Sequence, residues 1–264
     1  MPVQHEEVPS STPAPIAVQL YSLREESALD FPGVITRVGA AGFVGVELAG
    51  FHGLEPGEFA RIASDAGVVA SSGHLNDLTH DAFSRALDDL ASVGCATAVL
   101  AFLPPVAFAT LDAVQRSADA LNTAHEMAAQ RGVALGYHNH FWEFQHRVGD
   151  RTSWSVFLDL VVPEVFVELD TYWSAVGGAD PLDVIAHLGS RLRLLHVKDG
   201  PADDPQSPMV SVGTGSIDIA AILTSAPAAQ WHVVELDRCA TDMFTAVEDS
   251  YRYLTTSGLS RGRK

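Results

Sequence analysis

Eight short, mostly apolar runs recur along this chain of 264 residues, and a longer helical pattern or a turn separates each run from the next. Short apolar runs rich in β-branched residues are typical of parallel strands that are buried on both faces. The predicted strands are 16–22, 43–49, 68–74, 96–102, 133–139, 165–170, 192–198 and 232–237. Their alternation with helices indicates a parallel sheet with helical crossovers.

The segments between the strands have the period of amphipathic helices. Residues 80–94 place Phe83, Leu87 and Leu90 on one face, and residues 110–132 repeat the pattern. Each segment stops at a glycine, the usual residue at a helix C-terminus. Eight such units, in a chain close to the ~250 residues typical of that fold, predict an α/β protein with a single-domain (β/α)8 TIM barrel. A doubly wound open sheet is the alternative, weakened because no GxGxxG follows the first strand and no GxxxxGK[ST] occurs.

The ends of the chain differ in composition from the rest. Residues 1–14 are polar and contain three prolines, so we expect a disordered N-terminal tail, the barrel over 15–258 and a basic C-terminal tail over 259–264. The N-terminus has no basic region followed by an apolar one, and no apolar run reaches the ~18 residues of a membrane span. Two cysteines without metal-binding spacing favour a reduced, cytoplasmic protein, although a disulfide between them stays open.

The formal net charge of −17 limits the class of partner. A nucleic-acid-binding protein needs a basic face to meet phosphates, and this chain has only 16 lysines and arginines. We therefore expect neither a nucleic-acid nor a membrane partner. A small anionic ligand stays possible, because a local pocket can differ from the average surface.

Polar side chains gather where the predicted strands end, which is the edge where TIM barrels place catalytic groups. Buried charges are costly unless they are paired or bound to metal. Carboxylate and imidazole groups from neighbouring strands therefore favour a divalent metal site over a solvated rim. The residues in question are Gln19, Glu47, His74, His138, Glu168, Asp170, His196, Lys198, Glu235 and Asp237, with His140 and Glu143 just after the fifth strand.

Structural roles compete with these functional ones. Adjacent residues of a strand face opposite sides, so His138 and His140 share a face that Asn139 does not. His74 is equally consistent with a hydrogen-bonded structural histidine. Lys198 is equally consistent with an ion pair to Glu168 or Asp199.

Five stretches of the chain resemble the sugar phosphate isomerase/epimerase superfamily with the xylose isomerase-like TIM barrel. They are "VQLYSLR", "YHNHFWEF", "ELDTYWSAVGGADPLDVI", "LLHVKDG" and "VGTGSID". The resemblance covers nearly the whole chain after Ala14. It implies a divalent metal held by one residue from each of strands five to eight, with Mn expected first and Co, Mg or Zn as alternatives.

Carried over residue by residue, the resemblance assigns Asp170, His196 and Glu235 as metal ligands. The strand-five ligand is usually a glutamate, and here His138 stands in its place, so the choice among His138, His140 and Glu143 stays open. Two further positions depart from the pattern. Trp173 replaces a histidine and suits either a sugar face or core packing. Thr214 replaces a glutamate in the glycine turn 213–216, whose N–H groups we expect to face a substrate oxygen or phosphate.

The resemblance implies an isomerase or epimerase that removes a proton next to a carbonyl of a sugar or keto-sugar, through a metal-stabilised enediolate. In this scheme Glu235 takes the proton, His138 or Glu143 returns one on the opposite face, and Lys198 stabilises charge on oxygen. The residues expected to contact substrate are Gln19, Glu47, His74, His140 and Trp173. If a leaving group lies β to the carbonyl, the same first step gives a lyase or dehydratase acting on a keto-inositol or 3-keto-glycoside, which lowers the product mass.

Other functional classes remain as alternative hypotheses. The superfamily resembles endonuclease IV, but that enzyme needs more zinc ligands and basic DNA-binding loops, which the charge of −17 disfavours. A non-catalytic partner subunit or a homo-oligomer stays open. The expected ligand is a small carbohydrate, and an unphosphorylated one is favoured because no arginine cluster marks a phosphate site.

Overall fold

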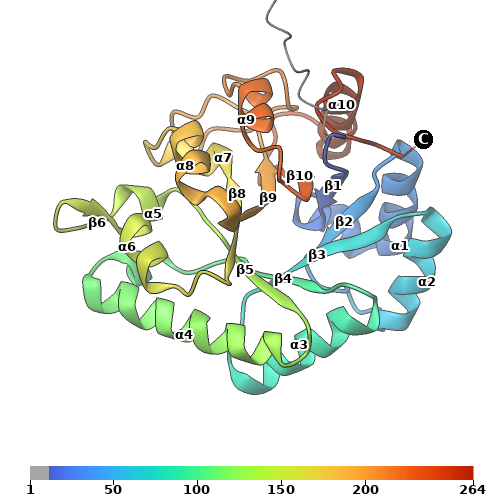
Figure 1. Ribbon diagram of the computed structural model, residues 1–264. Coiled ribbons are helices and arrows are strands. Elements are labelled where there is room, and N and C mark those ends of the chain that lie inside the picture. Colours follow the sequence, from blue (N-terminus) through green and yellow to red (C-terminus); the bar gives the residue numbers. More distant parts are fainter. Residues whose placement is uncertain (1–11, 264) are drawn as a thin grey trace, which may run out of the picture.

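The structure, a computed structural model, describes residues 12–263 and contains one closed barrel of eight parallel strands surrounded by helices (Figure 1). Around the barrel the strands follow the order β1-β10-β9-β8-β5-β4-β3-β2. Their bounds are β1 (Ile16–Gln19), β2 (Gly45–Leu48), β3 (Val69–Leu75), β4 (Thr97–Leu100), β5 (Ala134–His138), β8 (Phe166–Asp170), β9 (Leu192–Val197) and β10 (Trp231–Val234). The predicted TIM barrel and all eight predicted strands are confirmed, with bounds that agree to within three residues.

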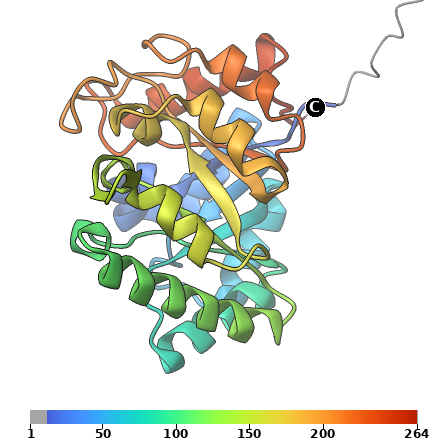
Figure 2. The same cartoon turned by 60° about the vertical axis from the view of Figure 1, so that its left-hand side comes forward.

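Helices connect the strands and cover the outside of the barrel (Figure 2). The α-helices are α1 (Arg24–Ala41), α2 (Pro56–Ala66), α3 (His80–Ser92), α4 (Leu111–Ala129), α5 (Trp142–Gln145), α6 (Ser153–Leu160), α7 (Thr171–Val176), α8 (Pro181–Leu188), α9 (Ile219–Ser225) and α10 (Met243–Thr256). Short 3-10 turns are η1 (Leu20–Leu23), η2 (Pro105–Phe108) and η3 (Gly189–Arg191).

The long helix α4 shows how the sequence sets these elements. The Thr110 side chain caps its first turn by accepting a hydrogen bond from Ala113 N, and Gly132 beyond its end has a φ of +69°. Its buried face carries Val114 and Leu121, as the apolar period predicts. None of the helices within residues 12–263 is long and apolar enough to cross a membrane.

One connection between barrel strands was not predicted. A small antiparallel hairpin, β6 (Arg147–Val148) with β7 (Arg151–Thr152), follows the fifth barrel strand. Strands of two residues are too short to leave a periodic pattern.

Both cysteines, Cys95 and Cys239, are free, so the disulfide that the sequence left open is absent.

The described ends of the chain pair with each other. Ile16 N donates to Arg261 O at 3.0 Å, Arg261 N donates to Ala14 O at 2.9 Å, and the Arg263 guanidinium donates to Gly39 O at 2.7 Å. Most of the predicted N-terminal tail, residues 1–11, lies outside the described residues, as does Lys264. The division into tail, barrel and C-terminal tail stays a prediction.

An apolar layer closes the half of the barrel in which the strands begin, which we call the lower half; the strands end in the upper half. Val99, Phe166 and Leu194 form a separate buried cluster inside it. A Cβ added to Gly136 on β5 would lie only 2.3 Å from the Phe166 ring, so this position requires a residue without a side chain. The polar side chains that TIM barrels use for chemistry lie at the other end, where the strands finish.

Candidate metal centre and active site

Most of the polar residues predicted at the strand ends converge inside the upper half of the barrel. Their side chains are buried or nearly so, and they come from six strands and from the segments that follow β9 and β10. The structure brings together Gln19 (β1), Glu47 (β2), His74 (β3), His138 (β5), Glu168 and Asp170 (β8), His196 (β9), Lys198 after β9, and Glu235 and Asp237 after β10.

Two overlapping sets of potential metal ligands lie within this cluster, and in each set the ligand atoms all lie within 4.8 Å of one another. We call His138, Asp170, His196 and Glu235 the upper group. We call His74, His138, Glu168 and His196 the lower group, because Glu168 precedes Asp170 by two residues on β8 and lies nearer the apolar layer.

The upper group is joined to a buried ammonium. Lys198 Nζ lies 2.9 Å from Asp170 Oδ2, 2.6 Å from Glu235 Oε2 and 2.6 Å from Asp237 Oδ2. The two alternative partners expected from sequence, Glu168 and Asp199, are not among these contacts. That expectation was wrong because Asp170 pairs with His196 near the end of β9, whereas Glu168 pairs with Leu194, two residues further from Lys198.

Carboxylates and imidazoles alternate in the lower group. Glu168 Oε2 lies 2.6 Å from His74 Nε2, 3.2 Å from His196 Nε2 and 3.3 Å from His138 Nδ1. Glu47 adds a second carboxylate, with its Oε1 2.7 Å from His196 Nε2 and 3.1 Å from His74 Nε2. The lower group and Glu47 together therefore bring three imidazoles against two buried carboxylates.

Hydrogen bonds from β1 and β3 fix Glu47. Gln19 Nε2 donates to Glu47 Oε1 at 2.6 Å, and Ser72 Oγ donates to Glu47 Oε2 at 2.5 Å. The side-chain oxygen of Gln19, Oε1, accepts a further hydrogen bond from Tyr21 N. Gln19 and Glu47 are both fully buried.

Burial and neighbouring charges shift the pKa values in opposite directions. Burial raises the pKa of Asp170 to about 6, although Lys198 and His196 act against that rise. Burial alone would also raise the pKa of Glu235, but Lys198 and His196 hold it far below its ordinary value. Burial opposes the charge of Lys198, yet Asp170, Asp237 and Glu235 raise its pKa well above the ordinary value. Glu235 and Lys198 are therefore charged at neutral pH.

The donor atoms fit a divalent cation. Within residues 12–263, His138 Nδ1, Glu168 Oε1 and Asp170 Oδ2 are buried without a hydrogen bond of good geometry, although Asp170 Oδ2 faces Lys198 as an ion pair. Unpaired buried polar atoms are costly unless an ion or water completes them. Imidazole nitrogen and carboxylate oxygen are the donors that Zn, Co, Fe and Mn accept in proteins.

The segment after β5 separates the three candidates for the strand-five ligand. His138 belongs to both groups, whereas His140 and Glu143 belong to neither. Glu143 lies on the short helix α5 rather than in a loop, and its Oε1 accepts hydrogen bonds from Tyr137 OH at 2.7 Å and His140 N at 3.0 Å. Burial raises the pKa of Glu143 to about 7. His140 stacks on Trp142 with ring centroids 4.3 Å apart.

Trp173 lies on α7, directly after Asp170. Its backbone N–H donates to Asp170 Oδ1 at 2.8 Å, so Asp170 caps the helix that carries the ring. The ring is 5% exposed and its centroid lies 5.4 Å from Lys198 Nζ. Trp173 therefore forms part of the wall around the buried ammonium.

The glycine turn 213–216 differs from the expectation. The N–H groups of Gly213 and Gly215 both donate to Asp199 Oδ2 at 2.9 Å, and Ile217 N donates to Asp199 Oδ1 at 3.2 Å. These donors are satisfied within the chain. The expectation that they face a substrate oxygen was wrong because the sequence does not show where the Asp199 carboxylate points.

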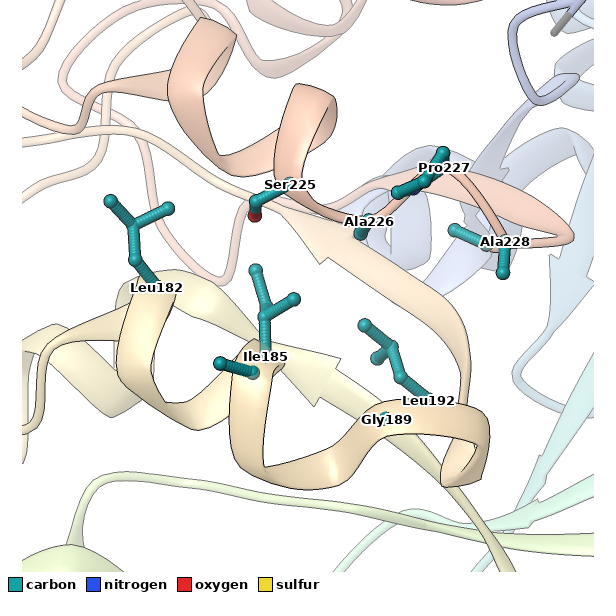
Figure 3. A pocket seen from close by; sticks show the side chains of 10 residues that line it. Leu182, Ile185, Gly189, Leu192, Ser225, Ala226, Pro227 and Ala228 are labelled. Carbon is teal, nitrogen blue, oxygen red and sulfur yellow. The ribbon is translucent and has the colours of Figure 1, made fainter. Parts of the chain in front are cut away.

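Sequence reasoning did not assign roles to Ser72 and Asp237, which contact Glu47 and Lys198. Ser72 has the same strand parity as His74, and this shared parity could have indicated that it faces the cluster. A surface hollow lies elsewhere, between α8 and the end of α9, and it is lined by apolar residues such as Ile185 and Leu192 (Figure 3). Leu192 begins β9, at the end of the strand opposite to the cluster.

Solved structures with a similar fold carry several related names. A sugar phosphate isomerase/epimerase from Parabacteroides distasonis is 24% identical, with a TM-score of 0.80 over 99% of this chain and 100% of its own. The probable 3-DHS dehydratase of petrobactin synthesis from Bacillus anthracis is 15% identical, with a TM-score of 0.75 over 91% and 98%. An L-ribulose 3-epimerase is 18% identical, with a TM-score of 0.66 over 93% and 94%. At these identities the likeness establishes the fold.

Curated protein sequences give no match to this chain. A sequence profile of the xylose isomerase-like TIM barrel matches residues 35–238, which span β2 to β10 and most of the cluster. The eight-stranded barrel and the convergence of imidazole and carboxylate groups at its C-terminal end agree with that match. The chain therefore belongs to the xylose isomerase-like TIM barrel family.

Proposed function

We propose that this chain is a divalent-metal-dependent isomerase or epimerase that removes a proton next to the carbonyl of a sugar or keto-sugar. The carrying observation is the convergence of imidazoles, carboxylates and one buried ammonium in the upper half of the barrel. Proton transfer next to a carbonyl needs a base, a proton donor and positive charge near the oxygen. The names of two similar structures, an isomerase/epimerase and a ribulose epimerase, support this class.

The expected metal ligands in this proposal are those of the upper group, His138, Asp170, His196 and Glu235, with Mn expected first and Co, Mg or Zn as alternatives. When bound, a divalent ion polarises a carbonyl and offsets the negative charge that develops on its oxygen.

Lys198 and Glu235 supply opposite charges on one side of the site. Lys198 keeps its proton, so its ammonium can hold the substrate oxygen on which negative charge develops. Glu235 is ionised and accepts the proton from carbon. Its low pKa makes it a weak base, so the reaction depends on a C–H group that the polarised carbonyl has already made acidic.

Epimerisation also needs a proton donor on the opposite face of the substrate. His138 lies in the cluster itself, and Glu143 has a pKa of about 7 that suits proton exchange at neutral pH. His140 and Trp173 are proposed to contact the substrate. Among the three residues expected to hold hydroxyl groups, His74 is the most accessible, because its side chain is 9% exposed while Gln19 and Glu47 are fully buried.

One observation favours a lyase or dehydratase as the second candidate. Glu143 is fully buried and accepts hydrogen bonds from Tyr137 and His140. By the family resemblance, His138 takes the place that a second glutamate usually has. Elimination from a keto-inositol or a 3-keto-glycoside needs one base and a proton for the leaving group, so it does not require a matched pair of carboxylates. A similar structure is named a probable dehydratase.

The test is incubation of the purified protein with Mn²⁺, Co²⁺ or Zn²⁺ and a panel of ketoses and 3-keto-glycosides in D₂O. An isomerase or epimerase incorporates deuterium next to the carbonyl, visible by NMR, and the product keeps its carbon skeleton and its substituents. A lyase gives a product that is lighter by the leaving group. The chelated protein and Glu235→Gln are the controls. Deuterium exchange that persists fully after chelation would contradict the metal dependence, and no exchange with any substrate would contradict the proposal.

A further inference from the structure

The His196 ring lies between two buried carboxylates, one inside the upper group and one outside it. Its Nδ1 lies 2.7 Å from Glu235 Oε2, and its Nε2 lies 2.7 Å from Glu47 Oε1. Glu235 belongs to the upper group, whereas Glu47 belongs to neither set of potential ligands. A neutral imidazole carries a hydrogen on one nitrogen and a free lone pair on the other. Only one nitrogen of His196 can therefore bind an ion, and the two carboxylates decide which one.

Glu47 is held in place as a hydrogen-bond acceptor. Gln19 Nε2 and Ser72 Oγ donate to its two oxygens, at 2.6 and 2.5 Å. The side chain is fully buried, and none of the described lysines and arginines forms an ion pair with it. Glu235 differs, because Lys198 Nζ already lies 2.6 Å from the oxygen that faces the imidazole. A buried carboxylate without an ammonium needs the imidazole N–H more than one that has such a partner.

Neighbouring rings hold the plane of the His196 ring. It stacks on His74, with ring centroids 5.3 Å apart and an interplanar angle of 12°, and the His138 centroid lies 4.4 Å away. His196 is fully buried. Rotating its ring by half a turn would place carbon atoms where the two nitrogens now lie, so both carboxylates would lose their contact. The packing therefore keeps Nδ1 of His196 toward the upper group and Nε2 toward Glu47.

His138 shows the same division at longer distances. Its Nε2 lies 3.8 Å from Asp170 Oδ2, inside the upper group, and its Nδ1 lies 3.3 Å from Glu168 Oε2, outside that group. Both histidines of the upper group thus turn one nitrogen toward its carboxylates and the other toward a carboxylate that does not belong to it. Of the two outside carboxylates, Glu47 makes the shorter contact with its histidine.

We propose that Glu47 is a positioning residue of the metal centre: it holds the Nε2 hydrogen of His196 and leaves Nδ1 free for the ion of the upper group. The inference rests on the proposed function and keeps its four metal ligands. Glu47 then acts through His196, in place of the expected contact with a substrate hydroxyl, and Gln19 and Ser72 hold Glu47. A carboxylate on the far nitrogen orients a ligating histidine and makes it a stronger donor.

The first test is calorimetric titration of the metal-free protein with Mn²⁺ and Zn²⁺. Glu47→Gln keeps the shape of the side chain but removes its charge, so we expect the affinity to fall about 10- to 100-fold. Ser71→Ala is the matched control, because the Ser71 hydroxyl is also buried but donates to Val46 O. This control should lose stability and keep its metal affinity within about threefold of the parent, since Ser71 does not touch Glu47. Circular dichroism shows whether each variant folds.

The second test uses the parent protein, so it decides the question even if Glu47→Gln does not fold. With ¹⁵N-labelled histidine and bound Zn²⁺, long-range proton–nitrogen NMR shows which ring nitrogen carries the hydrogen. We expect the assigned His196 signal to have its hydrogen on Nε2. A hydrogen on Nδ1, or a folded Glu47→Gln that binds metal as tightly as the parent, would overturn the role of Glu47 and leave the metal dependence in place. Failure of the parent to bind Mn²⁺ or Zn²⁺ would overturn the metal dependence and the inference together.

Discussion

Asn139 and Asp170 exchange two buried hydrogen bonds at the mouth of the barrel. Asp170 N donates to Asn139 Oδ1 at 2.9 Å, and Asn139 Nδ2 donates to Asp170 O at 3.2 Å. Asn139 thus replaces the missing strand-to-strand pairing just beyond the end of β5. Asn139 therefore fixes the position of Asp170 along the barrel axis relative to His138, the residue that precedes Asn139 in the sequence.

Replacing Asn139 by alanine should therefore destabilise the protein. The change leaves the buried N–H group of Asp170 without its partner, at a cost of about 1–3 kcal/mol, and removes one donor from the Asp170 carbonyl. We expect a loss of ~2–4 kcal/mol in the free energy of unfolding, measured by denaturant titration at pH 7. A loss below about 0.5 kcal/mol would show that water or a local shift replaces both hydrogen bonds.

Lys198 should be needed for both turnover and stability. Lys198→Met removes the ammonium from three carboxylates, so we expect kcat to fall about 10²- to 10³-fold, as for the loss of one oxyanion donor. Removing one partner of a buried ion pair costs about 3–5 kcal/mol of stability. That cost should be smaller at pH 5 than at pH 8, because the carboxylates can then be protonated, and denaturant titrations at both pH values measure it. A variant that keeps full kcat would exclude Lys198 from the reaction.

His232 should make the protein sensitive to mild acid. It is buried on β10 beside Ser260 Oγ, at 2.8 Å from its Nδ1, and burial lowers the pKa of His232 to about 4. The unfolded chain has a histidine pKa of about 6.5 and binds the proton first, so this contribution to stability is complete above pH 6.5. It is lost as pH falls from 6.5 to 4, by about 1.4 kcal/mol per pH unit and ~3 kcal/mol in total.

The comparison that isolates this effect is the parent against His232→Asn, each unfolded with denaturant at pH 7 and at pH 4.5. All other titrating groups are common to the two proteins and cancel in the difference. The stability gap between parent and variant should shrink or reverse at pH 4.5. Parallel changes in both proteins would show that His232 is protonated in the folded state.

Gly215 should not accept a larger residue. A Cβ at this position would lie 2.4 Å from Gly200 N and closer still to the Asp199 carboxylate. Gly215→Ala should therefore cost about 1–3 kcal/mol, as overpacking does. The matched control is Gly57→Ala on α2, where nothing lies within 4 Å of the added atom, and this change should be neutral or slightly stabilising. Thermal melting of both variants distinguishes them.

Much of the barrel could be predicted from the sequence, because strand length and helix period are local properties. The convergence of His138, Asp170, His196 and Glu235 followed from their place at strand ends. The partners of Lys198 did not, because they depend on the stagger between strands. The irregular pairing of β8 with β9 at Glu168 places Asp170 opposite His196, and no local pattern reports such a bulge.

The sequence likewise could not predict how deep in the barrel each side chain lies. Glu47 and Glu168 lie low enough in the barrel to meet three imidazoles, whereas Asp170 and Glu235 meet Lys198. Strand parity shows only that Glu168 and Asp170 face the same way. It cannot show that the two carboxylates end in different electrostatic surroundings.

Asp199 has one further consequence, for the segment between residues 200 and 213. Its carboxylate accepts the N–H groups of Gly200, Gly213 and Gly215, so this excursion leaves and returns at a single side chain. The second half of the excursion is also tied to the segment after β10, because Met209 N donates to Arg238 O and Asp237 N donates to Met209 Sδ. Because lengthening a loop costs little free energy, about 0.6 kcal/mol for each doubling, the part before Met209 is the place where the chain can accept insertions. New substrate ranges could be built on this barrel by grafting there, with the chemistry left in place.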